Sequence, residues 1–249
     1  QPSRMLGCAI WFAPRPESLV AEAWQLFAIF SATIFAVISG ACSILLAAIL
    51  ALVIAVFSGT LEPKIAYSGF SEGFILLIVV AFLVGRGVVN SGLGARIGLL
   101  LVRAFGKSSL GLAYSVVATD AVIAPAFPSN TARSGVLFPI VYALAESNGS
   151  HPWEDSRKQL GAYLMMVSMA GLGLSSALWL TAMAANPLGV AMVAERGVNI
   201  TFGSWLLASS VPTLCAMVFV PWLLYKLFPP GITATPQAPL QAAEKLREL

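Results

Sequence analysis

The chain has 249 residues, of which 58% are hydrophobic and only 10% are charged, and its formal net charge at pH 7 is +3. A mean hydropathy of +0.87 excludes a water-soluble globular domain and indicates an integral membrane protein. The charge is spread along the chain without a basic, aromatic-rich cluster, so we expect no nucleic-acid partner. Three separated cysteines and one histidine predict no metal cluster.

The first third of the chain predicts one short apolar stretch and two membrane spans. Residues 5–13 are too few to cross a bilayer, and we interpret them as the end of a span whose beginning is missing. Residues 21–38 and 41–57 predict two spans joined by a tight turn. A polar connector, residues 58–70, follows them.

Two further elements precede the most informative stretch. Residues 73–89 form another long apolar run, which predicts a span. Residues 93–105 carry basic side chains on roughly one face of a helix, and this pattern predicts an amphipathic helix at the membrane interface.

The stretch from Pro125 to Pro139 interrupts this apolar region. Two early prolines, Pro125 and Pro128, cannot both continue a regular helix, because each lacks a backbone N–H donor. They are followed by Ser129, Asn130 and Thr131, which are residue types that cap the start of a helix. We therefore expect one helix to end near Pro125 and another to begin near Asn130 or Thr131.

The uncharged flanks of this interruption decide how it is interpreted. Residues 108–119 and 134–145 are each too few to cross about 30 Å of hydrocarbon, so we predict a re-entrant hairpin with a polar tip. The free N–H groups and positive dipole end of the second helix would make an anion site. The alternative is a surface loop between prolines.

A second interruption is predicted further along the chain. Residues 160–185 form a long span rich in small residues, which runs into Asn186 and Pro187. We expect a second broken helix there, with a simple proline kink as the alternative. The two interruptions could face each other across a cavity, where helix N-termini would meet carboxylates. The unwound carbonyls and the Asn130 and Asn186 side chains would suit sodium.

The last segments predict a span at residues 202–228, a polar connector from residue 229, and a charged amphipathic segment at the end. We expect the chain to be a fragment of a longer protein. No nucleophile–base pair is visible, so we predict that the protein is not an enzyme. Asp120 and Arg133 are the charges of the hairpin region, and we expect them to pair or to face a cavity, because isolated charges are costly in a membrane.

The sequence also resembles a known family. The stretch PSNTARSGVLFPI, residues 128–140, resembles the Ser-Asn-Thr signature of the divalent anion/sodium symporter family. It is most similar to the bacterial and plastid branch of citrate/succinate, tartrate/succinate and 2-oxoglutarate/malate exchangers. The stretches EAWQLFAIF, LTAMAANPL, LYKLFPP and TPQAP support this resemblance in order along nearly the whole chain.

The resemblance implies an all-α polytopic helix bundle made of two inverted repeats, each with a re-entrant hairpin and a broken helix. It further implies a homodimer in which a transport domain moves against a scaffold, like an elevator. This chain holds a single Ser-Asn-Thr triplet and would be the first repeat. Residues 1–106 would be mostly scaffold, residues 107–228 part of the transport domain, and residues 229–249 a connector to the second repeat.

The resemblance also implies site residues. Ser129, Asn130 and Thr131 would bind the substrate. Sodium, if it is coupled to transport, would be held by Ser129, Asn130, Ala184, Ala185 and Asn186. Supporting roles would fall to Asp120, Arg133 and Pro187.

We therefore predict a secondary transporter of di- or tricarboxylates such as succinate, malate, 2-oxoglutarate, tartrate or citrate. Exchange is preferred, because Pro125 stands where some symporters have a serine in their sodium site; sodium-coupled symport is the alternative. A non-transporting membrane scaffold is the alternative of another class. We expect no cofactor apart from sodium, and partners limited to the carboxylate, the lipid bilayer and a second copy. The predicted location is a bacterial inner membrane, or otherwise the plastid inner envelope.

Overall fold

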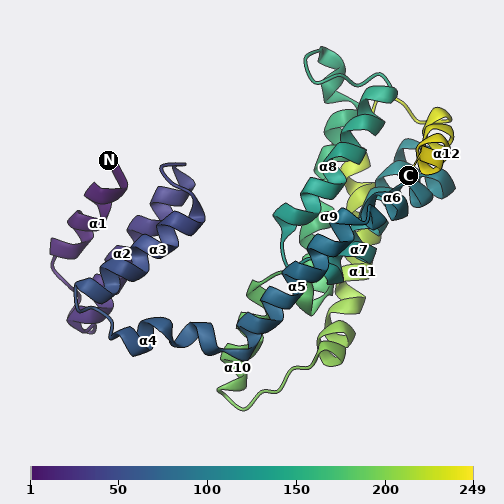
Figure 1. Ribbon diagram of the computed structural model, residues 1–249. Coiled ribbons are helices and arrows are strands. Elements are labelled where there is room, and N and C mark those ends of the chain that lie inside the picture. The colour runs from purple at the N-terminus through teal and green to yellow at the C-terminus, as the bar shows by residue number, and fades with distance from the viewer. Residues whose placement is uncertain (1, 249) are drawn as a thin grey trace. The chain divides into compact units, whose positions relative to one another are not determined.

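The computed structural model describes residues 2–248, and within this range its regular elements are all helices, without a β-strand (Figure 1). Five of its helices are long and apolar enough to cross a membrane: Ala21–Ile38, Gly73–Asn90, Ser109–Ala126, Leu160–Leu178 and Phe202–Leu227. This agrees with the predicted polytopic membrane protein. The chain divides into two compact units, one ending at Ile75 and the other beginning at Leu76.

The N-terminal unit contains α1 (Pro2–Phe12), α2 (Ala21–Ile38), α3 (Ile44–Phe57) and α4 (Pro63–Ser68). α1 packs along α2, where a side chain on Gly7 would meet Ala32. α3 is shorter than the predicted span of residues 41–57, because Ser43 caps it by accepting from Leu46 N–H. At about 1.5 Å per residue it is roughly 21 Å long.

The C-terminal unit contains most of α5 (Gly73–Asn90), together with α6 (Leu93–Phe105), α7 (Ser109–Ile123) and α8 (Asn130–Ser147). After these come α9 (Leu160–Leu178), α10 (Ala185–Ala194), α11 (Phe202–Leu227) and α12 (Gln237–Glu248). α9 is the central helix, since it packs against α7, α8 and α11. Its buried residues, Tyr163, Leu164 and Val167 among them, form the core with α7.

α12 is held close to α6 by a short extended segment that precedes it (Figure 1). Thr235 N–H donates to Lys107 O, and Ser109 N–H donates to Thr233 O, so the segment pairs with the turn between α6 and α7. The Thr235 hydroxyl adds a bond to Gly106 O. The polar tail predicted as a connector therefore packs into the C-terminal unit.

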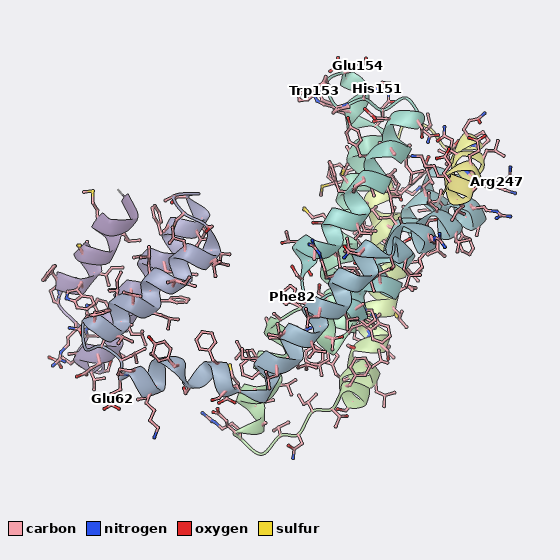
Figure 2. All side chains as sticks on the ribbon, viewed as in Figure 1. Glu62, Phe82, His151, Trp153, Glu154 and Arg247 are labelled. Carbon is pink, nitrogen blue, oxygen red and sulfur yellow. The ribbon has the colours of Figure 1, made fainter. Side chains whose placement is uncertain are left out.

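The polar loop between α8 and α9 projects from the bundle. Trp153 is 92% exposed, and Figure 2 shows it beside His151 and Glu154 at the tip of this loop. The histidine is thus placed far from the buried polar groups described below, as a solvated loop residue.

Candidate substrate site at two helix interruptions

The first interruption lies where the prolines predict it. α7 ends at Ile123 and passes into a 3-10 turn, Ala124–Ala126, after which the backbone is extended at Phe127. Ser129 then caps α8 by accepting from Ala132 N–H, with the cap residue in the extended conformation that such caps require. The break therefore rests on the two features read from the sequence, the prolines and the capping serine.

The helices beside this break are longer than the sequence predicts. α7 and its 3-10 turn give 18 continuous residues, Ser109–Ala126, which are enough to cross a membrane by length. α8 runs 18 residues through Pro139 to Ser147. The expectation that both flanks are too short to cross a membrane is wrong for α7, and the re-entrant hairpin stays a prediction. The chain nevertheless folds back on itself, because both helices pack on α9 and on each other.

The second interruption lies earlier than predicted. α9 ends at Leu178, a 3-10 turn covers Leu180–Ala182, and α10 begins at Ala185. Asn186 and Pro187 therefore lie in the first turn of α10, where proline costs little because the N–H groups of that turn have no helical partner. The sequence predicted this interruption, but it placed the break at Asn186 and Pro187, whereas α9 already ends at Leu178.

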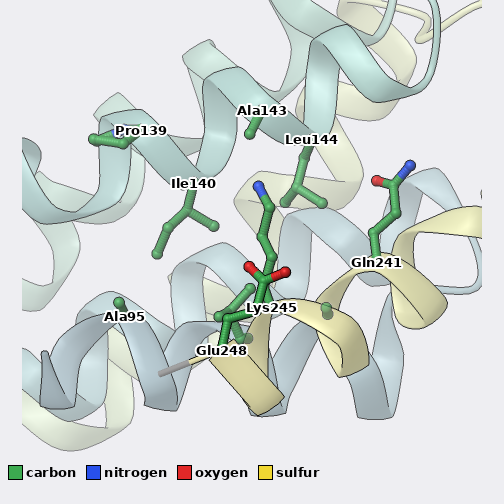
Figure 3. A pocket seen from close by; sticks show the side chains of 10 residues that line it. Ala95, Pro139, Ile140, Ala143, Leu144, Gln241, Lys245 and Glu248 are labelled. Atoms are coloured by element: carbon green, nitrogen blue, oxygen red, sulfur yellow. The ribbon is translucent and has the colours of Figure 1, made fainter.

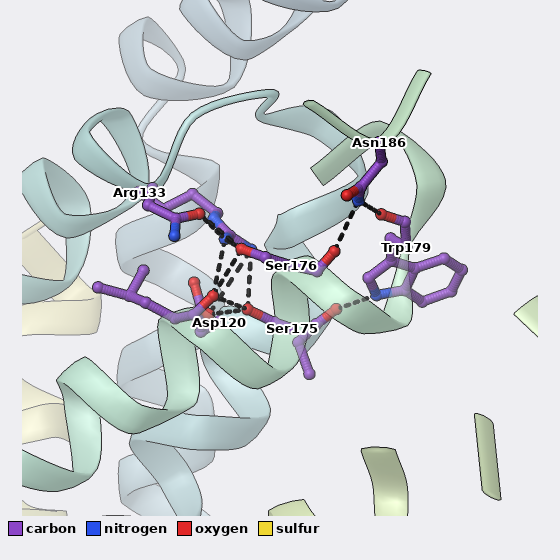
Figure 4. A network of polar contacts seen from close by, with 9 residues as sticks. Asp120, Arg133, Ser175, Ser176, Trp179 and Asn186 are labelled. Atoms are coloured by element: carbon purple, nitrogen blue, oxygen red, sulfur yellow. Dashed lines mark hydrogen bonds and ion pairs between the residues drawn. The ribbon is translucent and has the colours of Figure 1, made fainter. Parts of the chain in front are cut away.

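The carbonyls left free at the end of α9 are satisfied by side chains from other elements. Asn186 Nδ2 donates to Ser176 O at 2.8 Å and to Trp179 O at 3.2 Å (Figure 4). From α11, the Trp205 indole donates to Ala177 O and the Ser209 hydroxyl to Leu178 O. A helix can end inside an apolar bundle only if its last carbonyls find such partners.

The two interruptions touch each other. Ala184 N–H donates to Pro128 O at 3.1 Å, and the Thr181 hydroxyl donates to Pro125 O at 2.8 Å. The Trp179 indole also donates to Ala121 O at the end of α7. The two breaks therefore lie together, but they meet through direct hydrogen bonds, whereas the sequence predicted that they face each other across a cavity.

The polar residues of the first interruption, Ser129 to Thr131, form the first tip, and a buried charged pair lies directly behind it. Asp120 on α7 and Arg133 on α8 are 1% and 0% exposed, and Arg133 Nη1 lies 3.6 Å from Asp120 Oδ2. Ser175 on α9 bridges them, since Arg133 Nη1 donates to its hydroxyl oxygen at 2.8 Å and this hydroxyl donates to Asp120 Oδ2. The predicted pairing of the two charges is therefore confirmed (Figure 4).

The same guanidinium fixes the orientation of Asn130. Arg133 Nη2 donates to Asn130 Oδ1 at 2.6 Å, to Ser176 Oγ at 2.5 Å and to Leu172 O at 3.1 Å. Because an arginine can only donate, the atom of Asn130 that faces it must be the carbonyl oxygen. The NH2 group of this half-buried side chain is left without a partner in the described part of the chain, and is free to donate to an anion.

Asn186 has the opposite orientation. Its two partners, Ser176 O and Trp179 O, are backbone carbonyls that can only accept, so its NH2 group must face them. No hydrogen bond to Asn186 Oδ1 occurs within residues 2–248. This oxygen is therefore the group that Asn186 has left to offer a ligand.

These bonds bear on where a sodium ion could bind. Asn130 Oδ1 already accepts from a guanidinium, whose positive charge would repel a second cation at the same oxygen. The last carbonyls of α9 are capped as described above. The guanidinium therefore disfavours sodium at Asn130 Oδ1 itself, and the sodium site formed by Ser129, Asn130, Ala184, Ala185 and Asn186 stays a prediction.

The remaining predicted residues are placed around these tips. Thr131 is exposed in the first turn of α8, and Ser129 is half-buried as its cap. Pro187 is buried in α10, while Ala184 bonds across to the other break. Sequence reasoning missed Ser175 and Ser176 as hydrogen-bond partners of Asp120, Arg133 and Asn130, because it read them as small packing residues. Two adjacent hydroxyls within an apolar span were the available signal.

A separate groove of about 440 Å³ lies between α6, α8 and α12. Its walls are apolar, with Gln241, Lys245 and Glu248 of α12 at the edge (Figure 3). It contains no residue of either tip, so it is not the predicted site.

Comparison with known proteins shows which family the chain belongs to. Residues 4–249 match the family described as "Sodium:sulfate symporter transmembrane region". The chain belongs to this family. The match covers both compact units and both interruptions, and it confirms the resemblance to divalent anion/sodium symporters.

Several curated relatives are transporters. The chain is 45% identical over 247 residues to YflS of Bacillus subtilis (strain 168), to which malate transport is provisionally assigned; the alignment covers 98% of the chain and 52% of YflS. It is 42% identical over 248 residues to dicarboxylate transporter 2, chloroplastic, of Spinacia oleracea; this alignment covers 98% of the chain and 44% of the spinach protein. It is 32% identical over 256 residues to the L-tartrate/succinate antiporter of Escherichia coli (strain UTI89 / UPEC); this alignment covers 95% of the chain and 53% of the antiporter.

The chain spans about half the length of the curated relatives it matches. Family and relatives are membrane transporters, which agrees with the five apolar helices.

Proposed function

We propose that this chain forms one half of a secondary transporter that exchanges dicarboxylates across a bacterial inner membrane. The relatives support this assignment, since their names include malate, dicarboxylate and tartrate/succinate transport. The observation that carries the proposal is the Asn130 amide, whose oxygen is used internally and whose NH2 group is left to donate. A free NH2 group requires an acceptor atom in its ligand, which a carboxylate oxygen supplies.

The first tip would bind one substrate carboxylate. The Asn130 NH2 group stands at the start of α8, next to the unpaired backbone N–H groups and the positive dipole end of that helix. The exposed Thr131 hydroxyl is a further donor on the same turn. Arg133 lies just behind them; its charge is paired with Asp120, and its part is to hold Asn130 Oδ1 so that the NH2 group stays free to donate.

The second carboxylate would be bound by the second half of the complete protein. In this proposal the second half is an inverted repeat with its own polar tip, the two tips share one substrate, and the hairpin is re-entrant. The complete protein would be a homodimer whose transport domain, including α7 to α10, moves like an elevator against a scaffold containing α1 to α3.

Exchange is preferred over sodium symport for three reasons. One relative is named an L-tartrate/succinate antiporter. Pro125 stands where the family resemblance places a serine of the sodium site in some symporters. In addition, the side-chain oxygen of Asn130, which would be a sodium ligand, already accepts from Arg133.

The test is uptake of radiolabelled malate by the complete protein in proteoliposomes. We expect uptake to require internal malate or succinate and to be unchanged when external sodium is replaced by choline. Vesicles loaded with gluconate are the control for leakage. Uptake into gluconate-loaded vesicles that disappears in choline would support the alternative, sodium-coupled symport, which the family description favours. Absence of dicarboxylate uptake under both conditions would contradict both.

A further inference from the structure

The buried pair Asp120–Arg133 is poorly built as a stabilising salt bridge. Its N–O distance is 3.6 Å, and both Asp120 Oδ1 and Arg133 Nε are buried without a hydrogen-bond partner in the described residues. The cost of removing two charges from water can exceed their mutual attraction, and apolar replacements of buried pairs are often neutral or stabilising. Stability alone is therefore a weak explanation for these two charges.

The pair instead connects three helices to the first tip. From Asp120 on α7 the bonds run to the Ser175 hydroxyl on α9, to Arg133 Nη1 on α8, and through Arg133 Nη2 to Asn130 Oδ1. The guanidinium is a rigid planar fork, so a partner that fixes Nη1 also fixes the direction of Nη2. The position of Asp120 is thus transmitted to the Asn130 side chain over two hydrogen-bonded residues.

We propose that Asp120 is a positioning residue for substrate binding: it holds the Arg133 guanidinium so that the Asn130 amide keeps its NH2 group turned outward. This inference rests on the proposed function, in which Asn130 binds a dicarboxylate. Asp120 itself does not touch the substrate, since it is 1% exposed and its bonded oxygen points to Ser175. Asp120 thus contributes to the affinity of the first tip for the dicarboxylate.

The first experiment is Asp120→Asn in the complete protein. The variant keeps the shape of the side chain and removes the charge paired with Arg133. The guanidinium is then held only by neutral acceptors, namely Ser175, Ser176, Leu172 O and Asn130, and its direction is less well fixed. We expect the KM for malate to rise about tenfold to a hundredfold, the range that loss of one charge-assisted bond produces. The Vmax per folded transporter should stay within about twofold, because saturating substrate selects the correct amide orientation.

Three further variants keep the test decisive if Asp120→Asn folds poorly. Ser175→Ala removes the bridging hydroxyl without leaving a lone charge, and should also raise the KM. Asp120→Glu, which keeps the charge, should regain part of the affinity. Asp155→Asn, a matched change in the exposed loop before α9, should leave the KM unchanged.

The double variant Asp120→Asn/Arg133→Gln separates positioning from stability. Removing both charges should restore the melting temperature of the detergent-solubilised protein, because no unpaired charge remains, while the KM stays raised. If the double variant regains the native KM, or if Asp120→Asn lowers only the melting temperature, the positioning role is refuted. Failure of the proposed function looks different, since native protein would then show no saturable malate uptake at all.

Discussion

The two helix interruptions carry asparagines with opposite roles, and the difference comes from their neighbours. Asn130 turns its oxygen to Arg133, which can only donate, and keeps its NH2 group free. Asn186 turns its NH2 group to two backbone carbonyls, which can only accept, and keeps its oxygen free. The same residue type therefore keeps a free donor at one tip, which suits the carboxylate-binding role proposed for Asn130, and caps a helix end at the other.

This contrast makes the isosteric change from asparagine to aspartate informative at both positions. In Asn130→Asp the oxygen that faces Arg133 remains, and the free NH2 group becomes a second, negatively charged oxygen. We expect the largest effect here, a loss of malate affinity of about a hundredfold or more, with the melting temperature preserved by the retained bond to Arg133. Uptake kinetics and thermal unfolding of the complete protein measure the two quantities.

A matched control is Asn199→Asp, in the exposed segment between α10 and α11. This change should alter neither the malate affinity nor the melting temperature. Unaltered malate affinity in Asn130→Asp would show that its NH2 group does not contact the substrate.

The corresponding change at the second tip should act on stability. Asn186→Asp replaces the NH2 donor by an oxygen that faces Ser176 O and Trp179 O, so two buried carbonyls lose their partner. We expect a destabilisation of about 1–3 kcal/mol for each unsatisfied group, seen as a clear fall in melting temperature. A variant that melts like the native protein would mean that these carbonyls are capped in another way.

The direct bond between the tips should have a smaller effect. Thr181→Val keeps the side-chain volume close to that of threonine and removes the hydroxyl that donates to Pro125 O. We expect a loss of about 1 kcal/mol, the usual net value of one hydrogen bond, with the KM for malate nearly unchanged. Ser134→Ala, which removes a hydroxyl bonded only within the first turns of α8, is the control. A large rise in KM for Thr181→Val would indicate that the tips must stay joined for binding.

The sequence predicts the first interruption better than the second for a physical reason. At the first, Pro128 and the capping Ser129 act locally, so the break can be read from neighbouring residues. At the second, α9 ends at Leu178 without a proline or glycine there. It ends because Trp205 and Ser209 from α11 cap its carbonyls, and such long-range partners are invisible in the local sequence.

The buried charges also show that local sequence does not reveal long-range partners. Two isolated charges in an apolar region predict a pair, and Asp120 and Arg133 do pair. That the guanidinium also reaches Asn130 follows from the spacing of three residues on α8, which places both side chains on one face. The bridging role of Ser175 requires the packing of α9 against α7 and α8, which only the folded chain reveals.

The most direct test of this account is a cryo-EM structure of the complete protein in lipid nanodiscs with malate bound. We predict a malate carboxylate within hydrogen-bonding distance, about 2.7–3.2 Å, of Asn130 Nδ2, with Asn130 Oδ1 still bonded to Arg133. Malate bound away from the start of α8, or a sodium ion at Asn130 Oδ1 with the guanidinium displaced, would contradict it.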